Sequence, residues 1–301
     1  MTTIEAPLKY SKDYEYLKPP NLRPQCPGCA YGPTARYLYR AIGPKVITTS
    51  VPGCGFPSGV GPDGIAIDVM GALFGNAASL AAGISSALEV LGDTETMVVP
   101  IIGDGGTFDI GFGAVSAAAE RNDNMLYVCK DNEAYQNTGN QRSSAAPWFS
   151  TNTTNPSGFA KPEYKKDIDT ILAGHRIPYL ATVTVAFPDD FMRKVEKAKS
   201  IKGFRFIHVF CPCPTGWGFT ADLTIEMARL AVETKYFPLF EVVNGVDMTI
   251  NYQPKGTPLA EYLRPQRRFR EITEEQVAEF QRNVDERWER LLYLAAYKKS
   301  D

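Results

Sequence analysis

Short apolar segments rich in valine and isoleucine alternate along this 301-residue chain with longer stretches whose apolar residues have helical spacing. A strand that is apolar on both faces must be covered on both sides, so this alternation predicts an α/β fold with a mostly parallel sheet between helices. The predicted strands are residues 45–49, 97–102, 125–129, 181–185 and 206–210. The predicted helices are residues 34–41, 72–91, 110–120, 165–173, 189–200 and 220–234. Ligands of such sheets bind beyond the carboxyl ends of the strands, where we therefore expect the functional site.

Composition excludes several classes of protein. With 44% hydrophobic residues the chain can form a large core, which excludes a disordered protein or a disulfide scaffold. Its 32 basic and 34 acidic residues leave a net charge of −2, so neither nucleic acid nor a membrane surface is indicated as a partner. Residues 1–10 lack the features of a secretory signal, and we expect a cytoplasmic protein whose cysteines are not paired as disulfides.

Residues 69–88 form an uncharged stretch of about the length that crosses a bilayer, and Gly71 and Gly75 have the spacing of a helix-packing motif. The stretch is nevertheless rich in small and polar residues, and Asp68 and Glu89 flank it in place of basic or aromatic anchors. We expect a buried helix packed closely against the sheet and no membrane span.

The C-terminal part differs from the rest of the chain. Residues 251–270 are rich in proline and arginine and predict an irregular arm, after which Thr273 and Gln276 resemble a capping box that opens a long helix. The apolar residues of this helix recur every three or four positions: Val277, Phe280, Val284, Trp288, Leu291 and Ala295. This stripe could pack on the core of the chain, the interpretation we favour, or dock on another subunit.

The first candidate site follows the predicted strand 97–102. There Gly103, Asp104, Gly105 and Gly106 precede a helical stretch. Glycines let a ligand approach the backbone, and the start of a helix offers free N–H groups to an anion such as phosphate. Taken alone, the segment is equally compatible with an ordinary tight turn.

The next predicted strand places Asn132 at a neighbouring strand end, 28 residues after Asp104. A carboxylate and an amide oxygen are hard ligands that suit Mg²⁺ completed by waters and phosphates. Here the chain resembles the thiamine diphosphate enzymes. The resemblance implies that Asp104 and Asn132 bind Mg²⁺ through their side chains and Ala134 through its carbonyl, and that Tyr135 and the three glycines contact the cofactor. The usual motif has a pair of asparagines, whereas this chain has Asp131 before Asn132.

The cysteines form the second candidate site. Cys129 lies within an apolar run and is interpreted as a buried hydrophobic residue. The other five lie in predicted loops beside glycine or proline: Cys26, Cys29, Cys54, Cys211 and Cys213. Four such thiolates could bind either a tetrahedral Zn²⁺ or a [4Fe–4S] cluster. A redox-active pair formed by Cys26 and Cys29 is a weaker alternative because it leaves Cys54 and Cys213 without a role.

Together the two sites resemble the β subunit of the 2-oxoacid:ferredoxin oxidoreductases, of which pyruvate:ferredoxin oxidoreductase is the best-known member. The motifs that carry the resemblance are, in order, CPGC, a third cysteine 25 residues on, GDGGTFDIG, DNEAYQNTGNQRS and CPCPTGW. The resemblance implies that the [4Fe–4S] ligands are Cys26, Cys29, Cys54 and Cys213, although Cys211 could replace Cys213. It also implies that Asn137, with Thr138 beside it, reaches the reacting part of cofactor and substrate.

The resemblance further implies a thiamine diphosphate-binding domain of the pyrophosphate type over residues 1–250, with cysteine-bearing N-terminal loops, and a C-terminal arm and helix over residues 251–301. It implies oxidative decarboxylation of a 2-oxo acid, with coenzyme A taking the acyl group and the cluster passing electrons to ferredoxin. It implies an α subunit that supplies an activating glutamate and most substrate contacts, and γ and ferredoxin-like δ subunits.

Alternatives remain open on the substrate. Pyruvate is the first choice, but Phe108 and the residues around Cys54 differ from pyruvate-type members, so phenylglyoxylate, oxalate or a branched-chain acid are alternatives, as is NAD as final acceptor. A zinc-stabilised, non-catalytic subunit is a remote alternative. A decarboxylase with both cofactor-binding halves in one chain is disfavoured because 301 residues are too few. His175 and His208 are interpreted as structural.

Overall fold

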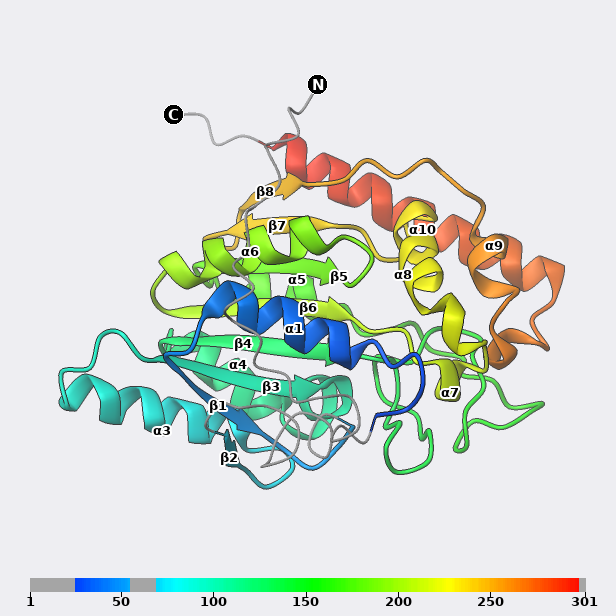
Figure 1. Ribbon diagram of the computed structural model, residues 1–301. Helices are drawn as coiled ribbons and strands as arrows, with labels where there is room; N and C mark the ends of the chain where they lie inside the picture. The colour runs from blue at the N-terminus through cyan, green and yellow to red at the C-terminus, as the bar shows by residue number, and fades with distance from the viewer. Residues whose placement is uncertain (1–24, 55–68, 298–301) are drawn as a thin grey trace.

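A computed structural model describes residues 25–54 and 69–297, and within them eight strands form one sheet in the order β2-β1-β3-β4-β6-β5-β7-β8 (Figure 1). The strands are β1 (Val46–Ser50), β2 (Val69–Gly71), β3 (Met97–Gly103), β4 (Met125–Asp131), β5 (Tyr179–Thr184), β6 (Phe204–Phe210), β7 (Phe240–Val243) and β8 (Asp247–Ile250). The six strands β2, β1, β3, β4, β6 and β5, in their order across the sheet, are each parallel to their neighbours, as the alternating sequence predicts. Every residue of β4, β5 and β6 is buried, which explains why their sequences are apolar without alternation.

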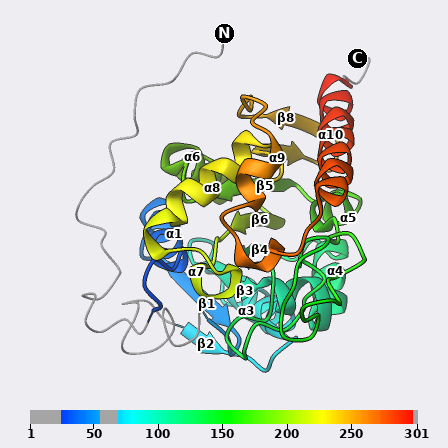
Figure 2. The same cartoon turned by 90° about the vertical axis from the view of Figure 1, so that its right-hand side faces the viewer.

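Helices cover both faces of the sheet (Figure 2). On one face lie α1 (Tyr31–Ile42) and α6 (Pro188–Ser200), whose apolar side chains pack with Leu126 and Val128 of β4. The opposite face is covered by α3 (Ala77–Val90), α4 (Phe112–Glu120), α5 (Ile168–Ala173) and α10 (Glu274–Ala296). At the carboxyl end of the sheet, α7 (Pro214–Trp217), α8 (Thr224–Glu233) and α9 (Leu259–Leu263) enclose a third, aromatic-rich cluster.

One edge of the sheet was not expected from the sequence. Strands β7 and β8 pair antiparallel with β5 and with each other. The turn between them contains Asn244 and Gly245, both with positive φ, which is the backbone of a tight hairpin turn. The Asn-Gly pair could therefore have indicated a hairpin in the sequence. Strands β7 and β8 were nevertheless missed because they have only four residues each, too few to show a clear pattern.

A helix is present in the stretch 69–88, as predicted, but its predicted start and its burial throughout are wrong. Residues 69–71 form the edge strand β2, and α3 begins only at Ala77. Of the α3 residues, Ala77, Ala78 and Ala81 are buried, while the helix projects from the body of the molecule (Figure 1). Among the described residues, every helix is too short or too polar to cross a bilayer.

The C-terminal helix begins as predicted. The Thr273 side chain accepts a hydrogen bond from the Gln276 N–H, and the Gln276 side chain accepts one from the Thr273 N–H. The apolar stripe packs on the core of the chain itself through Phe280, Val284 and Trp288, together with Leu291. The preceding arm contains α9 and a 3-10 turn at Arg267–Phe269.

Candidate functional site

A pocket of about 200 Å³ opens at the carboxyl ends of β1, β3 and β4. It is lined by all nine residues that the sequence nominates for cofactor and substrate: Gly103, Asp104, Gly105, Gly106, Asn132, Ala134, Tyr135, Asn137 and Thr138. They come together because parallel strands end at the same edge of the sheet, with Gly103 of β3 paired with Lys130 of β4.

Three oxygen-bearing groups converge in this pocket. One atom of the Asn132 side-chain amide lies 3.0 Å from Asp104 Oδ1 and 2.9 Å from the Ala134 carbonyl oxygen. If this atom is the nitrogen, it donates to both; if it is the oxygen, three oxygens face one another and need a cation between them. In the second orientation Asn132 Nδ2 lies 2.9 Å from the Tyr31 hydroxyl, which can accept its hydrogen while donating to the Lys130 carbonyl at 3.2 Å. The donor set therefore fits Mg²⁺.

The electrostatics of Asp104 agree with a cation site. The side chain is only 1% exposed, and the Ser143 hydroxyl donates a hydrogen bond to it. Burial raises the pKa of Asp104 well above its usual range, and the charge of Asp131 raises it further. A buried carboxylate of this kind is stabilised as an anion by a neighbouring positive charge, which a bound metal ion supplies.

Gly105 leaves space for the Tyr135 ring, which lines the pocket. A Cβ atom on Gly105 would overlap the Tyr135 ring, and one on Gly106 would lie 2.6 Å from Ile102 Cγ2. The Tyr135 hydroxyl is held in place because it donates to the Gly105 carbonyl at 3.3 Å and lies 3.2 Å from Asp109 Oδ2. The helix predicted over 110–120 starts earlier than expected, as a π-helical turn at Gly105–Ile110, and continues as α4.

Asn137 and Thr138 lie on an exposed loop at the mouth of the pocket. The loop is closed by paired backbone hydrogen bonds between Tyr135 and Gln141, at 2.9 and 3.2 Å. Thr138 Oγ1 also donates to the Tyr135 carbonyl at 3.3 Å, whereas the Asn137 side chain has no hydrogen bond with any described residue. The loop therefore presents Asn137 toward whatever enters the pocket.

The cysteine loops lie next to this pocket, and Cys54 lines it. Cys26 and Cys29 are joined by a turn in which the Cys29 N–H donates to the Cys26 carbonyl at 3.1 Å. Gly28 within this turn has φ of 71°, and a Cβ there would collide with the Ala221 carbonyl. This close approach sets the CPGC loop against the segment that leads into α8.

The sulfur atoms of Cys26, Cys29, Cys54 and Cys213 are electrostatic neighbours. Burial raises the pKa of Cys213 to about 12, and the charges of Cys29, Cys54 and Cys26 also raise it. Burial likewise raises the pKa of Cys54 to about 11, with contributions from Cys29 and Cys26. The Cys211 sulfur lies 3.6 Å from the Thr34 hydroxyl, and of the four cysteines named above only Cys29 is among the main groups that raise its pKa. Within residues 25–54 and 69–297, no three His, Cys, Asp or Glu side chains are already arranged to hold a metal ion.

Cys129 is fully buried on the face of the sheet that α4 covers, as predicted.

His208 is also buried, but both of its ring nitrogens lie close to carboxylates, which an apolar strand does not lead one to expect. Its Nδ1 lies 2.9 Å from Asp169 and its Nε2 lies 3.0 Å from Asp131. Asp131 in turn accepts a hydrogen bond from Lys165 at 2.5 Å.

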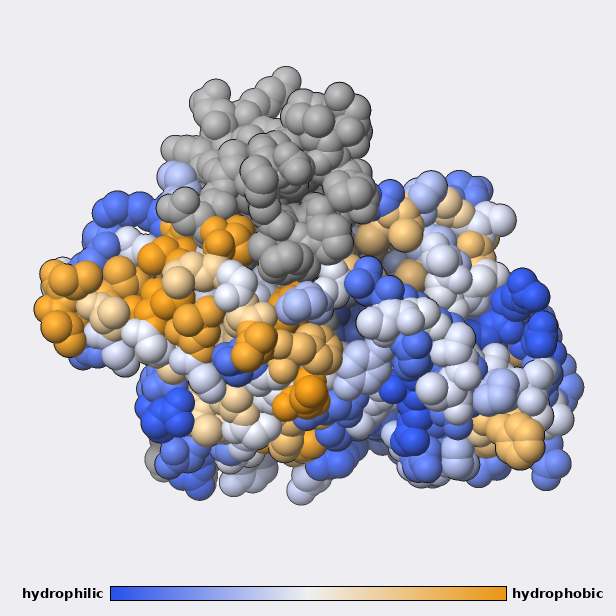
Figure 3. Space-filling model, turned by 90° about the horizontal axis from the view of Figure 1, so that it is seen from below, coloured by the Kyte–Doolittle hydropathy of each residue, from blue (hydrophilic) through white to orange (hydrophobic). Residues whose placement is uncertain are grey.

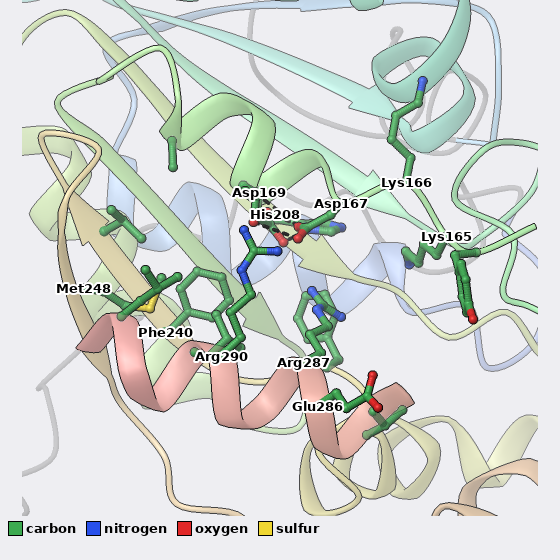
Figure 4. Close-up of a pocket in the computed structure, with 18 of the residues that line it drawn as sticks. Lys165, Lys166, Asp167, Asp169, His208, Phe240, Met248, Glu286, Arg287 and Arg290 are labelled. Carbon is green, nitrogen blue, oxygen red and sulfur yellow. Dashed lines mark hydrogen bonds and ion pairs between the residues drawn. The ribbon is translucent and has the colours of Figure 1, made fainter. Parts of the chain in front are cut away.

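This buried network borders a second cavity of about 810 Å³, between the sheet and α10 (Figure 4). Arg290 reaches from α10 into this cavity toward Asp167 and Asp169 (Figure 4). The cavity has no glycine-rich strand end of the kind that accepts a diphosphate, so the pocket containing Asp104 is the better candidate for the cofactor. The ion pairs of Lys165 with Asp131 and Glu133 were missed from the sequence, and no local pattern marks them.

Comparison with known proteins agrees with this geometry. Residues 60–209 match the profile of the thiamine pyrophosphate enzyme, C-terminal TPP binding domain. The chain is 43% identical over 279 residues to the pyruvate synthase subunit PorB of Methanocaldococcus jannaschii, covering 87% of this chain and 92% of the relative. It is also 43% identical over 284 residues to the ketoisovalerate oxidoreductase subunit VorB of Pyrococcus abyssi, covering 90% and 91% respectively.

A solved structure supports the same relationship. The 2-oxoglutarate:ferredoxin oxidoreductase of Magnetococcus marinus, described with 2-oxoglutarate, coenzyme A and succinyl-CoA bound, aligns with a TM-score of 0.58 at 25% identity. The alignment covers 75% of this chain and 84% of that chain. The profile places the matched domain among thiamine pyrophosphate enzymes, and the relatives are subunits of oxidoreductases that work as complexes. The chain belongs to the β subunits of the 2-oxoacid:ferredoxin oxidoreductases.

Proposed function

We propose that this chain is the β subunit of a coenzyme A-dependent oxidoreductase that decarboxylates a 2-oxo acid, with pyruvate as first choice, and passes electrons through a [4Fe–4S] cluster to ferredoxin. The observation that carries the proposal is the convergence of Asp104, Asn132 and Ala134 in a pocket that Cys54 also lines. Thiamine diphosphate, when bound, supplies the carbanion chemistry by which a 2-oxo acid loses carbon dioxide.

In this proposal the chain holds the cofactor through its diphosphate. Asp104, Asn132 and the Ala134 carbonyl bind Mg²⁺, which neutralises the buried carboxylate and the phosphates together. Gly105 and Gly106 allow the diphosphate to lie against the backbone at the start of the helical segment. Asn137 and Thr138, at the pocket mouth, orient the substrate.

The cluster is assigned to Cys26, Cys29, Cys54 and Cys213. Cys213 is favoured over Cys211 because its electrostatic neighbours are the other three cysteines, whereas Cys211 packs against Thr34. The backbone N–H of Gly216 donates to Cys213 Sγ at 3.3 Å, a contact that stabilises a thiolate.

The substrate proposal is unchanged by Phe108. This side chain is 0% exposed and packs edge-on against the His208 ring, so it lies outside the cofactor pocket and gives no reason to disfavour pyruvate. The residues that follow Cys54 lie outside the described part of the chain. Relatives named for pyruvate and for ketoisovalerate are equally similar, so a branched-chain acid, phenylglyoxylate and oxalate stay as alternatives, and NAD remains an alternative acceptor.

Exposed apolar side chains beside the pocket support the proposed α subunit. Phe74 lines the pocket and is 39% exposed, and Leu73 beside it is 78% exposed. Val90 and Leu91 at the end of α3 are more than three-quarters exposed, and the orange surface at the left of Figure 3 lies over this helix. An apolar surface next to a half-open pocket is typical of a subunit interface. We propose that the α subunit covers it and supplies the activating glutamate, while γ and ferredoxin-like δ subunits carry electrons onward.

Two substitutions in the anaerobically purified complex test the proposal. Asp104→Ala should weaken thiamine diphosphate binding by about 100-fold or more and keep the iron content. Cys54→Ala should abolish the iron–sulfur absorption and leave cofactor binding intact. Cys211→Ala is the matched control and should keep the iron that Cys213→Ala loses. Stoichiometric zinc in a colourless protein would support the non-catalytic alternative, and unchanged 2-oxo acid oxidation in both test variants would refute the assignments.

A further inference from the structure

Lys130 occupies an unusual position between the two proposed sites. It is the second-last residue of β4 and pairs with Gly103 of β3 and Val209 of β6. Side chains alternate along a strand, so Lys130 lies on the same face as Leu126 and Val128, which is the face covered by α1. Its side chain lines the pocket that contains Asp104.

The Lys130 ammonium lacks an anionic partner within the described part of the chain. The residue is 7% exposed, and its Nζ lies 4.2 Å from the centre of the Tyr31 ring. No carboxylate or hydrogen-bond acceptor of the described residues contacts it, in contrast to Lys165, which is paired with Asp131 and Glu133. A buried ammonium that contacts only an aromatic ring is costly, since desolvation of the charge is not offset by a counter-charge. The position therefore indicates an anion outside the described residues, and the pocket that Lys130 lines offers a place for one.

The surroundings of Lys130 identify the kind of anion. Burial lowers the pKa of Lys130, and the neighbouring titratable groups that oppose this shift are thiols: Cys211, Cys54, Cys29 and Cys129. Two of these, Cys29 and Cys54, are proposed cluster ligands. Four thiolates around an iron–sulfur core give an anionic centre, and each electron that it accepts adds one negative charge. A fixed positive charge in a medium of low dielectric constant stabilises the more negative state.

We propose that Lys130 is a positioning residue for electron transfer, whose ammonium stabilises the reduced state of the four-cysteine iron–sulfur centre and so raises its reduction potential. This inference rests on the proposed function, because it needs the cluster at Cys26, Cys29, Cys54 and Cys213. It assigns to the chain a means of setting the potential, in addition to holding the ligands. The cofactor diphosphate is the competing anion, because Lys130 also lines that pocket.

The test is a redox titration of the full chain, reconstituted anaerobically with iron and sulfide and followed by electron paramagnetic resonance. Lys130→Met removes the charge and keeps most of the side-chain length, whereas Lys130→Arg keeps the charge. Lys202→Met is the matched control, since Lys202 is exposed and follows α6 at the other end of the sheet, where its Nζ donates to the Thr94 carbonyl. Losing an unpaired buried charge should not lower the melting temperature of the apo chain, so Lys130→Met should fold.

We expect Lys130→Met to lower the ratio of reduced to oxidised cluster at a fixed potential about tenfold, which is about 59 mV for one electron. Lys130→Arg and Lys202→Met should leave the midpoint near that of the parent chain. A full iron content with an unchanged midpoint in Lys130→Met would overturn the inference while sparing the proposed function. Weakened thiamine diphosphate binding at an unchanged midpoint would assign the ammonium to the diphosphate instead. A parent chain that takes up no iron and sulfide would overturn both.

Discussion

The paired carboxylates around His208 should make the stability of this protein fall with rising pH over a defined range. Burial lowers the pKa of His208, but the charge of Asp169 and the hydrogen bonds that the imidazole donates to Asp131 and Asp169 outweigh this and raise it to about 9. The ordinary value is about 6.5. The folded state therefore binds the imidazole proton more tightly than the unfolded state does, which contributes stability wherever the proton is present in the folded protein.

The size and sign of the effect follow from these two values. A difference of about two and a half pKa units corresponds to about 3 kcal/mol of unfolding free energy. This contribution is present in full below about pH 6.5 and is lost as the pH rises through about 9, with a slope of about 1.4 kcal/mol per pH unit between these limits. The hydrogen-bonded partner Asp131 has its pKa lowered to about 2, where burial is outweighed by Lys165 and His208, so it stays ionised over this range.

Urea unfolding of the full chain at half-unit steps from pH 6 to pH 9.5 measures the effect. His208→Gln should flatten the decline, and the difference between parent and variant should shrink as the pH rises. His175→Gln is the matched control because it removes the only other histidine, whose ring contacts the Ser116 hydroxyl at 3.0 Å and no carboxylate of the described residues. Parallel curves for the parent and His208→Gln would refute the reasoning.

Three further results are expected. Gly105→Ala should weaken thiamine diphosphate binding at least tenfold in calorimetry, because the new Cβ overlaps the Tyr135 ring; Gly113→Ala, with open space around it, should not. Trp288→Ala should lower the unfolding free energy by about 3–5 kcal/mol in urea denaturation, and a loss under 1 kcal/mol would argue against its burial in the core. Leu73→Asp should change the stability of the isolated chain by less than about 0.5 kcal/mol yet weaken binding to the α subunit in a pull-down titration; unchanged binding would place the interface elsewhere.

The pocket was predictable from the sequence because its residues directly follow predicted strands. Each of Asp104 and Asn132 directly follows an apolar strand, and parallel strands end at one edge of the sheet whatever the details of packing. The same holds for the capping box at Thr273, where the two partners are three residues apart. Such features need only the order of elements and the chemistry of a few neighbouring residues.

What escaped prediction depends on contacts between distant residues or on surfaces that extend beyond one chain. Arg268 reaches Glu133 across 135 positions of sequence, and no periodicity marks such a pair. An apolar segment such as α3 is indistinguishable from a core helix in sequence, since the same composition occurs on buried faces and on faces that another subunit covers, as we propose for α3. The alternation of strands and helices also says nothing of a short antiparallel edge such as β7 and β8.

The missed ion pairs of Glu133 explain how the site keeps its shape. Glu133 follows the metal-binding candidate Asn132 with φ of 64°, a backbone conformation that is unfavourable for this residue. It is held there by Lys165 at 2.8 Å and by the buried Arg268 at 2.6 Å. The strain of the turn is thus offset by these two ion pairs.

The segment that begins at Cys213 also stabilises the turn at Asn132 and Glu133. The Trp217 indole N–H donates to the Asn132 carbonyl at 2.9 Å, and Trp217 ends the four-residue helix α7, whose N-cap is Cys213. The Arg268 guanidinium lies 3.9 Å from the centre of the Trp217 ring and so joins the two sets of contacts. Cys213 and the residue proposed to hold the metal are therefore connected through one helical turn. The proposed cluster and cofactor sites would keep a constant separation for this reason, and electron transfer between them would depend on that separation.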